Sequence, residues 1–355
     1  MSGLSLAREI LRASPNSSVH LFDRRPRRPH PQRTFCFFSP LEDSLPVEPY
    51  KKWNNVRFRG REFDRSIATD AAPYALVRGE DFFKITLQEL EERGAQFSWE
   101  CEHTNVQDNA IVTDAGVYEF DKVVDASFEV SKARSLLWQS FGGLWIQTQE
   151  DSFDPSTALL MDLLPSSESS PVVFVYVLPI SPTEALIEHT TFSCRQMPSE
   201  WHFSACEEWI RSHVRGEYAV IGREAGVIPM GLERPGASET IVIGSAGGAI
   251  RASTGYAFLN IQRQARELAR ALVQGGGGDV PRSHEGLPGW YATADALFLK
   301  ALAKAPLKGS LLMGRLLDKA PAQPLIRFLA GDANIVEALR VMSSVPKMMM
   351  MRALI

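Results

Sequence analysis

The chain has 355 residues, of which 45% are hydrophobic and 23% are charged, and its formal net charge is −4. This length allows one large domain or two linked domains with a proper core, and the acidic balance argues against a nucleic-acid partner. The four cysteines and seven histidines show no metal-ligand spacing, and such scattered cysteines favour a reducing compartment over a disulfide scaffold. No signal peptide is predicted, and the longest apolar run, residues 171–180, is too short to span a bilayer.

The first half of the chain alternates between helices and strands. A helix is predicted over residues 1–13, with one apolar face made by Leu4, Leu6, Ile10 and Leu11. The strand VHLFD (19–23) ends in an acid and is followed by a basic stretch, RRPRRPHPQR, and by TFCFF. Residues 74–97 are predicted to form a strand or loop and then a helix that stops at Gly94, and short strands fill residues 98–126.

The second half begins as β-structure and ends as helix. Residues 140–230 have mostly strand-like patterns, interrupted by one helix near SEWHFSACEEWIRSHV. A strand followed by a helix returns at TIVIGSAGG, the run GGGG (275–278) is a flexible break, and the remainder is predicted to be helical. An α/β half interrupted by a β-rich insert, with a helical tail, is the expected arrangement.

The N-terminal segment matches part of a dinucleotide-binding unit. Such a unit runs strand, G-x-G-x-x-G, helix, strand, acid, with the pyrophosphate at the helix N-terminus and the acid on a ribose hydroxyl. Gly3 opens a helix, and Asp23 ends the next strand at the expected distance. If Gly3 is the third glycine, the first strand and two glycines would lie upstream of Met1. Alternatively, Gly3 is only a small residue at a helix start and Asp23 a strand-end cap.

A second phosphate-compatible stretch is IGSAGGAIRASTGYAF, residues 243–258. Its bare backbone lies between a strand and a helix, where N–H groups can bind an anion. Tight strand–helix packing would explain Gly247 or Gly248, but explains the run 253–256 less well. Two such stretches far apart in the sequence suit FAD better than a mononucleotide. The candidate cofactor residues here are Gly244, Ala246, Gly247, Gly248, Ser253, Thr254, Gly255 and Tyr256.

Several phrases together resemble the lycopene β-cyclases of the bacterial type. They are LFDRRP, TFCFF, FVYVLPISPTEALIEHTTFS, EAGVIPM, IGSAGGAIRASTGYAF and, near the end, LIRFLAGDA and VMSSVPK. The resemblance implies an FAD-binding fold like that of the aromatic hydroxylases, and a redox-neutral ring closure at the ends of a linear carotenoid. It also implies that the flavin is used in its reduced form, with NAD(P)H as the reductant.

This chain departs from the family pattern in three places. Ser245 stands where an Asp is usual, and His189 replaces the acid next to the Thr in IEHT. The first strand and its glycines are not in the sequence, so weak FAD binding is expected.

The expected fold is mixed α/β: a Rossmann-like FAD-binding domain without its first strand, an antiparallel β-rich substrate domain and a helical C-terminal region. The FAD-binding domain is predicted over residues 1–139 and 239–278, the substrate domain over 140–238 and the helical region over 279–355.

Two acids are the catalytic candidates. Strand alternation puts Leu186, Glu188 and Thr190 on one face and His189 on the other. An acid on an apolar strand stays protonated through desolvation, as a donor to an alkene must, although Glu188 could instead pair with a structural arginine. Glu224, in EAGVIPM, would hold the flavin-side loop or act as a second acid. The resemblance to the hydroxylases implies that Arg78 contacts the flavin.

The substrate implied by the resemblance is lycopene, a hydrocarbon dissolved in membrane. We expect a cytoplasmic protein in peripheral contact with lipid at the inner face of the cell membrane, through amphipathic helices and the terminal KMMMMRALI. The methionines could instead pack against the core. Two other functions stay open: a flavin-dependent monooxygenase or polyprenyl reductase on the same fold, and a non-catalytic carotenoid- or lipid-binding protein.

Overall fold

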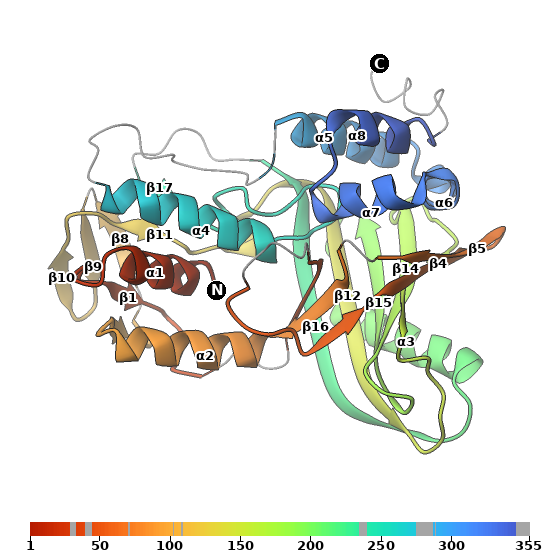
Figure 1. The fold of residues 1–355 in the computed structure, drawn as a ribbon, viewed down its shortest axis with the longest axis horizontal. Coiled ribbons are helices and arrows are strands. Elements are labelled where there is room, and N and C mark those ends of the chain that lie inside the picture. Colours follow the sequence, from red (N-terminus) through yellow and green to blue (C-terminus); the bar gives the residue numbers. More distant parts are fainter. Residues whose placement is uncertain are drawn as a thin grey trace.

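The computed structural model describes residues 1–28, 33–39, 45–69, 72–101, 103–107, 109–233, 240–274, 287 and 289–345. The GGGG break, the terminal KMMMMRALI and residues 29–32 of the basic stretch lie outside this range. In Figure 1 a part built from helices and short strands lies on the left, and a large sheet with helices on both of its faces lies on the right.

The left-hand part, called here the nucleotide half, contains two parallel strand pairs. β1 (His20–Phe22) pairs with β7 (Gln96–Ser98), and β11 (Val124–Asp125) pairs with β17 (Ile241–Val242). The facing edges of β1 and β11 have no strand partner among the described residues. Three short strands close the outer end in the order β10 (Gly116–Glu119), β9 (Ala110–Thr113) and β8 (His103–Gln107).

Helices α1 (Ser2–Ala13), α2 (Gly79–Glu92) and α4 (Phe258–Val273) cover this half (Figure 1). The single apolar face predicted for α1 is in fact two faces. Leu4 and Leu11 pack with Phe82 and Leu90 of α2, whereas Leu6 packs with Ala265 and Leu268 of α4. Because α1 is sandwiched between two helices, it buries apolar side chains on both sides.

The large sheet has seven strands in the order β16-β12-β15-β14-β13-β4-β5. All of its pairs are antiparallel except β13 with β4. Its strands are β16 (Tyr218–Leu232), β12 (Ser135–Thr148), β15 (Glu184–Ser193), β14 (Val172–Pro179), β13 (Thr157–Leu164), β4 (Asn55–Gly60) and β5 (Phe63–Ala68). The predicted β-rich domain is therefore extended by a hairpin, β4–β5, from the first half of the chain. This hairpin protects the edge of β13.

A small sheet connects the two halves. Its order is β2 (Thr34–Phe38), β6 (Tyr74–Arg78) and β3 (Lys51–Trp53). The Trp53 indole donates to the Pro179 carbonyl at 2.9 Å, and Lys51 donates to the Ile180 carbonyl at 3.1 Å, both at the end of β14. The small sheet is thus fixed to the large one by hydrogen bonds as well as by packing.

The two faces of the large sheet are covered by different helices. Ile187 and Leu144 pack under α3 (Ser199–His213), while Leu186 packs on the opposite face. That opposite face is covered by residues 289–345, called here the cap: α5 (Gly289–Lys304), η2 (Pro306–Lys308), α6 (Gly309–Lys319), α7 (Ala322–Ala330) and α8 (Ile335–Met342). The alternation predicted for residues 186–190 is confirmed, and it places Glu188 on the cap side.

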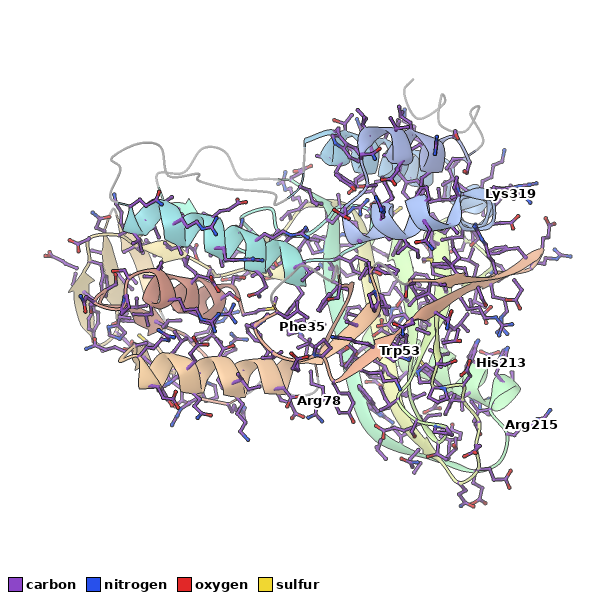
Figure 2. The ribbon with its side chains drawn as sticks, viewed as in Figure 1. Phe35, Trp53, Arg78, His213, Arg215 and Lys319 are labelled. Atoms are coloured by element: carbon purple, nitrogen blue, oxygen red, sulfur yellow. The ribbon has the colours of Figure 1, made fainter. Side chains whose placement is uncertain are left out.

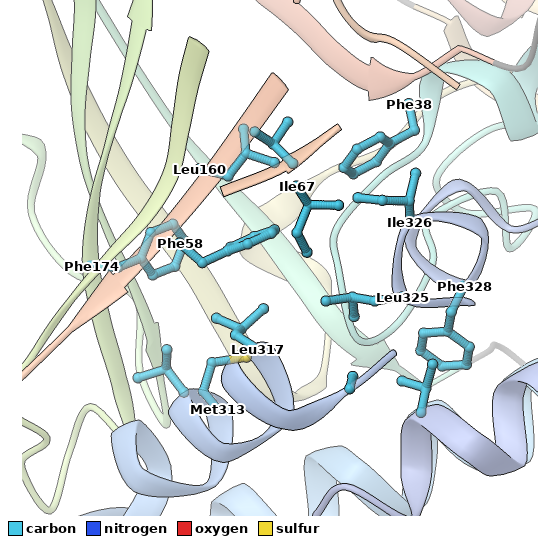
Figure 3. Packing of buried hydrophobic residues seen from close by; sticks show 14 of the residues in the cluster. Phe38, Phe58, Ile67, Leu160, Phe174, Met313, Leu317, Leu325, Ile326 and Phe328 are labelled. Atoms are coloured by element: carbon cyan, nitrogen blue, oxygen red, sulfur yellow. The ribbon is translucent and has the colours of Figure 1, made fainter. Parts of the chain in front are cut away.

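The cap is held to the sheet by apolar packing and by one arginine. Figure 3 shows Met313 and Leu317 of α6 close to Phe58 and Phe174 of the sheet, within one buried cluster. Arg65 of β5 donates from Nη1 to three carbonyls at the end of α6, at 2.7–2.9 Å. A cation at a helix C-terminus satisfies free carbonyls and favours the helix dipole. In the described part of the chain, no helix combines the length and apolar character needed to cross a membrane.

Candidate active site

Two buried acids lie in one row across the large sheet. Gly143 of β12 is the register partner of Glu188 on β15 and of Glu224 on β16, and Tyr176 of β14 is the partner of Glu188. Residues directly opposite each other point to the same face. With strands about 4.8 Å apart, the backbones of the two acids are roughly 10 Å apart. Both acid side chains therefore project into the same space above β12.

Gly143 keeps the space between the acids open. A Cβ at this position would lie 3.0 Å from the Leu186 Cδ1 atom and 3.3 Å from the Cβ and Cγ atoms of Glu188. Any side chain here would therefore press on the carboxyl-bearing side chain of Glu188.

The Glu188 carboxyl is isolated from water. The residue is 1% exposed, its Oε1 accepts from the Thr190 hydroxyl at 3.0 Å, and its Oε2 has no hydrogen-bond partner in the structure. Burial raises the pKa of Glu188 well above 4.5, the charge of Glu224 adds to this effect, and the neighbouring Tyr176 and Thr190 hydroxyls oppose it. Burial thus favours the protonated form of Glu188, which makes it a suitable proton donor.

Glu224 has a similar but milder environment. It is 7% exposed, its Oε1 accepts from the Thr34 hydroxyl at 2.7 Å, and its Oε2 also has no partner in the structure. Burial raises the pKa of Glu224 to about 7, although the Thr34 hydroxyl and the charge of Arg33 act in the opposite direction. Two carboxyls in one apolar site resist joint ionisation, so the pair retains at least one proton at pH 7.

A cavity of about 1800 Å³ connects the acids with the nucleotide half and the cap. Its wall at the acid end is apolar and includes Phe58, Leu160, Met161, Phe174 and Phe192. Pockets for a single small ligand commonly measure about 300–1,000 Å³. The space is therefore large enough for a cofactor and a second, largely apolar molecule.

The nucleotide end of the cavity fits a bound dinucleotide. Helices α1 and α4 both begin at the cavity wall, and neither has a side-chain hydrogen bond at its N-cap. Their first N–H groups can thus bind an anionic diphosphate. Gly255 lines the wall with φ +72°, and the neighbouring Gln139 Oε1 is buried without a partner. A planar ring with N–H groups would satisfy that oxygen.

The sequence pattern of the lycopene cyclase protein family matches residues 1–355. The chain belongs to this family. Members are enzymes of carotenoid biosynthesis, and the fold is that of FAD-binding flavoproteins. No curated protein matches the chain.

Solved structures share the fold of this lycopene cyclase family member at low sequence identity. A geranylgeranyl bacteriochlorophyll reductase-like protein from Thermoplasma acidophilum is 13% identical, with a TM-score of 0.67 over 99% of this chain and 95% of that one. A flavoprotein/dehydrogenase from Cytophaga hutchinsonii is 9% identical, with a TM-score of 0.60 over 99% and 97%. The flavin-dependent brominase Bmp2 is 15% identical, with a TM-score of 0.58 over 96% and 95%.

Six of the predicted cofactor residues of this cyclase family member line the cavity: Gly3, Asp23, Ser253, Thr254, Gly255 and Tyr256. Asp23 is bound by Arg25, which donates to it from the backbone N–H and from the guanidinium at 2.8–3.0 Å. A ribose hydroxyl would therefore share this carboxylate with Arg25.

The other predicted cofactor residues are not among the described residues of the cavity wall: Arg78, Gly244, Ala246, Gly247 and Gly248. The Gly244 N–H donates to the Gln264 side chain at 2.7 Å, and the same side chain donates to the Gly247 carbonyl at 2.9 Å. A Cβ at Gly247 would lie 2.5 Å from the Val242 carbonyl oxygen. These contacts show the tight strand–helix packing that the sequence left as the alternative explanation.

Arg78 is the last residue of β6 and precedes the N-terminus of α2, close to solvent (Figure 2). Its guanidinium pairs with Asp81 at 2.7 Å and stacks over the Tyr50 ring at 4.3 Å. Both contacts keep its charge on the outside of the small sheet.

His189, which replaces the family's second acid, faces away from the cavity. Its Nδ1 lies 2.9 Å from the Nδ1 of His202 on α3, and its backbone N–H donates to the Cys206 sulfur. Burial, with a smaller contribution from His202, lowers the pKa of His189 to about 3. The neutral ring therefore fixes β15 against α3 while Glu188 points to the other side.

The structure adds site residues that the sequence reasoning did not select. They are Thr34, Gln139, Gly143, Tyr176 and Asp295. The alternation of VVFVYVLP marks Tyr176 as a polar residue within an apolar strand. Gly143 is identified only by the strand register, and Asp295 only by the packing of the cap against the cavity.

Gly255→Val is expected to lower flavin content at least tenfold. The left-handed backbone at φ +72° resists a branched side chain, and its Cβ would lie 2.5 Å from the Gln139 Oε1 at the cavity wall. Bound flavin is measured by absorbance after purification with excess FAD. Gly94→Val is the control, because Gly94 has φ +80° and open space around it. Equal flavin loss in the control would assign the effect to backbone strain alone.

Glu224→Gln is expected to stabilise the flavin-free protein above pH 7. The pKa of Glu224 is raised from 4.5 to about 7 in the fold. The contribution of this carboxyl to the free energy of unfolding is therefore fully present below pH 4.5 and is lost as the pH rises through 7. The loss is on the order of 3 kcal/mol. Thermal unfolding at pH 5 and pH 8 measures the effect, with the exposed Glu168→Gln as the control. A gain that is the same at both pH values would refute the assignment.

Proposed function

We propose that this chain closes the linear ends of lycopene into β-rings without net oxidation, with Glu188 as the proton donor. The observation that supports this most directly is the pair of buried acids on either side of Gly143, each with one unpartnered oxygen, in an apolar cavity. Membership of the lycopene cyclase family supplies the reaction class.

The reaction needs a strong acid in a site without water. Glu188 transfers its proton to the terminal alkene, and the next double bond attacks the resulting tertiary cation to close the ring. The Glu188–Glu224 pair then accepts a proton from a ring carbon, which restores the acid and leaves the product with the same composition as the substrate. Phe58, Phe174 and Phe192 exclude water that would trap the cation as an alcohol. The Glu224 carboxyl raises the pKa of Glu188 and adds negative charge near the cation.

FAD is the proposed cofactor, and NAD(P)H is its proposed reductant. The N-termini of α1 and α4 would hold the diphosphate, with Thr254 and Gly255 beside it. In its reduced anionic form, the flavin would supply negative charge next to the reacting end of the substrate. Gly255 and Tyr256 lie on the path from the diphosphate region to the acids and would orient the ring system.

The proposed setting is the cytoplasmic side of the cell membrane, in peripheral contact with lipid. A substrate as apolar as lycopene resides in the bilayer. Its transfer to the apolar end of the cavity avoids exposing its surface to water. Lycopene and lipid are therefore the proposed partners.

Anaerobic conversion of lycopene in liposomes, with FAD and NADPH, tests this function. The expected product carries β-rings and has unchanged mass, and far less than one NADPH is consumed per ring. A product that is heavier by two hydrogens per double bond would favour the polyprenyl reductase, an activity also suggested by the name of the Thermoplasma structure. Oxygen-dependent product with one NADPH per turnover would identify a monooxygenase. Bound carotenoid without conversion would indicate a binding protein.

A further inference from the structure

Large exposed apolar side chains gather on the cap. Among the described residues there are twelve such side chains, and five of them lie between residues 307 and 339 of the cap. They are Leu307, Leu311, Ile335, Val336 and Leu339, with exposed fractions of 51% to 64%. Leu307 and Leu311 belong to η2 and α6, and the other three belong to α8. Apolar exposure concentrated in this way marks a contact surface rather than ordinary surface variation.

Basic residues lie close in the sequence to these apolar side chains. Lys304, Leu307, Lys308, Leu311 and Arg315 are all exposed, and they follow one another at intervals of one, three or four residues. The cap as a whole, residues 289–345, has seven Lys and Arg against four Asp and Glu, which is a net charge of +3 in a chain whose net charge is −4. Long basic side chains can lie along apolar surface and still reach anionic groups.

The same two helices form part of the cavity wall on their inner side. Met313, Leu316 and Leu317 of α6 and Val341 and Met342 of α8 all line the cavity that contains Glu188. A helix that is apolar on both sides needs an apolar neighbour on each side. Helices α6 and α8 therefore separate the apolar end of the cavity from the outside by the thickness of a single helix.

We propose that this face of the cap, made by Lys304, Leu307, Lys308, Leu311, Arg315, Ile335, Val336, Leu339 and Arg340, docks on an anionic lipid leaflet. The carotenoid then passes from the leaflet through the cap, whose helices α6 and α8 line the cavity, a step that rests on the proposed function. The net positive charge of the cap supports a lipid partner over a second copy of the chain. A two-fold contact through this face would place two basic surfaces, each with Lys304, Lys308 and Arg315, against each other.

The docking is interfacial rather than spanning. Leucines and isoleucine would enter the boundary between headgroups and acyl chains, and the lysines and arginines would contact anionic headgroups. Binding should therefore depend on anionic lipid and weaken at high salt.

Vesicle flotation with the purified full chain tests the docking surface. The vesicles contain phosphatidylcholine alone or phosphatidylcholine with about a third phosphatidylglycerol. We expect binding to the anionic vesicles only, and a loss of at least tenfold in the double variant Leu311→Glu/Leu339→Glu. The matched control is Ile85→Glu/Val117→Glu. Both residues lie on the nucleotide half, and their exposed fractions are 47% for Ile85 and 64% for Val117. This control should bind as the wild type does.

Three results would overturn the proposal. They are failure of the wild type to bind anionic vesicles, equal binding by the Leu311→Glu/Leu339→Glu variant, and equal losses in the variant and its control. Analytical ultracentrifugation of the same proteins provides a further check. A wild-type dimer that this variant converts to a monomer would assign the face to a second copy of the chain.

A comparison of substrate delivery separates this proposal from the proposed function. The Leu311→Glu/Leu339→Glu variant should convert lycopene dispersed in detergent at the wild-type rate, but should lose at least tenfold with lycopene in anionic vesicles. Loss by the same factor in both media would place the effect in the cavity and refute docking. If the wild type converts no lycopene in either medium but still floats with anionic vesicles, the cyclase proposal fails and the docking surface stands.

Discussion

Glu188→Gln is expected to reduce ring formation by about 10²-fold or more, while the protein keeps its flavin. The amide preserves shape and the acceptor for the Thr190 hydroxyl but has no transferable acid proton, and losing a positioned general acid costs rates of this order. Chromatography of the carotenoids after anaerobic incubation measures the rate, and absorbance measures the flavin. Glu188→Asp should retain part of the activity, limited by its shorter reach.

Glu184→Gln is the matched control for this experiment. Glu184 begins the same strand, β15, and its side chain does not line the described cavity. The control should therefore cyclise at the wild-type rate. If Glu188→Gln retained its flavin and also cyclised at the wild-type rate, Glu188 would be removed from the mechanism. Glu224 would then be the next donor to test.

Asp295→Ala is expected to destabilise the fold by about 3–5 kcal/mol, because it leaves a buried guanidinium without its counter-ion. The side chains of Arg251 and Asp295 are 2% and 3% exposed, and their closest N–O distance is 3.2 Å. Arg251 also donates to the Phe328 carbonyl of α7, and Asp295 accepts from the Ser253 hydroxyl at 2.7 Å. This cluster fixes the cap to the turn that carries Thr254 and Gly255.

Urea unfolding of the flavin-free protein measures this loss. Asp64→Ala is the control, since the Arg57–Asp64 pair has side chains that are 42% and 45% exposed. An exposed pair contributes only about 0–1 kcal/mol. A loss of the same size in both variants would show that Arg251 finds another partner or becomes hydrated once Asp295 is removed.

Local patterns in the sequence were sufficient for most elements and for one acid. The alternation of EALIEHTTF placed Glu188 on the correct face of its strand, and the helix end at Gly94 follows from a glycine with φ +80°. The placement of the hairpin β4–β5 beside β13 does not follow from the sequence, because their parallel pairing joins segments about 100 residues apart. No local pattern encodes such a pairing.

The sequence also leaves the cofactor-binding glycines uncertain in identity, because their role depends on the assembled structure. Glycine permits both close packing and close approach of a ligand, and the sequence alone does not separate the two. At Gly247 the nearest atoms belong to its own strand, whereas Gly255 faces the cavity. The row of Tyr176, Glu188, Gly143 and Glu224 depends on the register of four strands, which is a property of the assembled sheet.

The path of the chain between the two halves restricts how the molecule can open. Residues 51–68 run through the small and the large sheet, the chain re-enters the nucleotide half at α2 after β6, and it crosses again before β12 and after β16. A hinge between the halves would have to bend all of these crossings at once, and the bonds from Lys51 and Trp53 to β14 would break. Domain closure of the kind that uses one or two flexible connections is therefore unavailable to this fold. We therefore expect the motions that admit the proposed carotenoid to lie within the helices of the cap. Relaxation measurements should find millisecond exchange there and none at the interface between the halves.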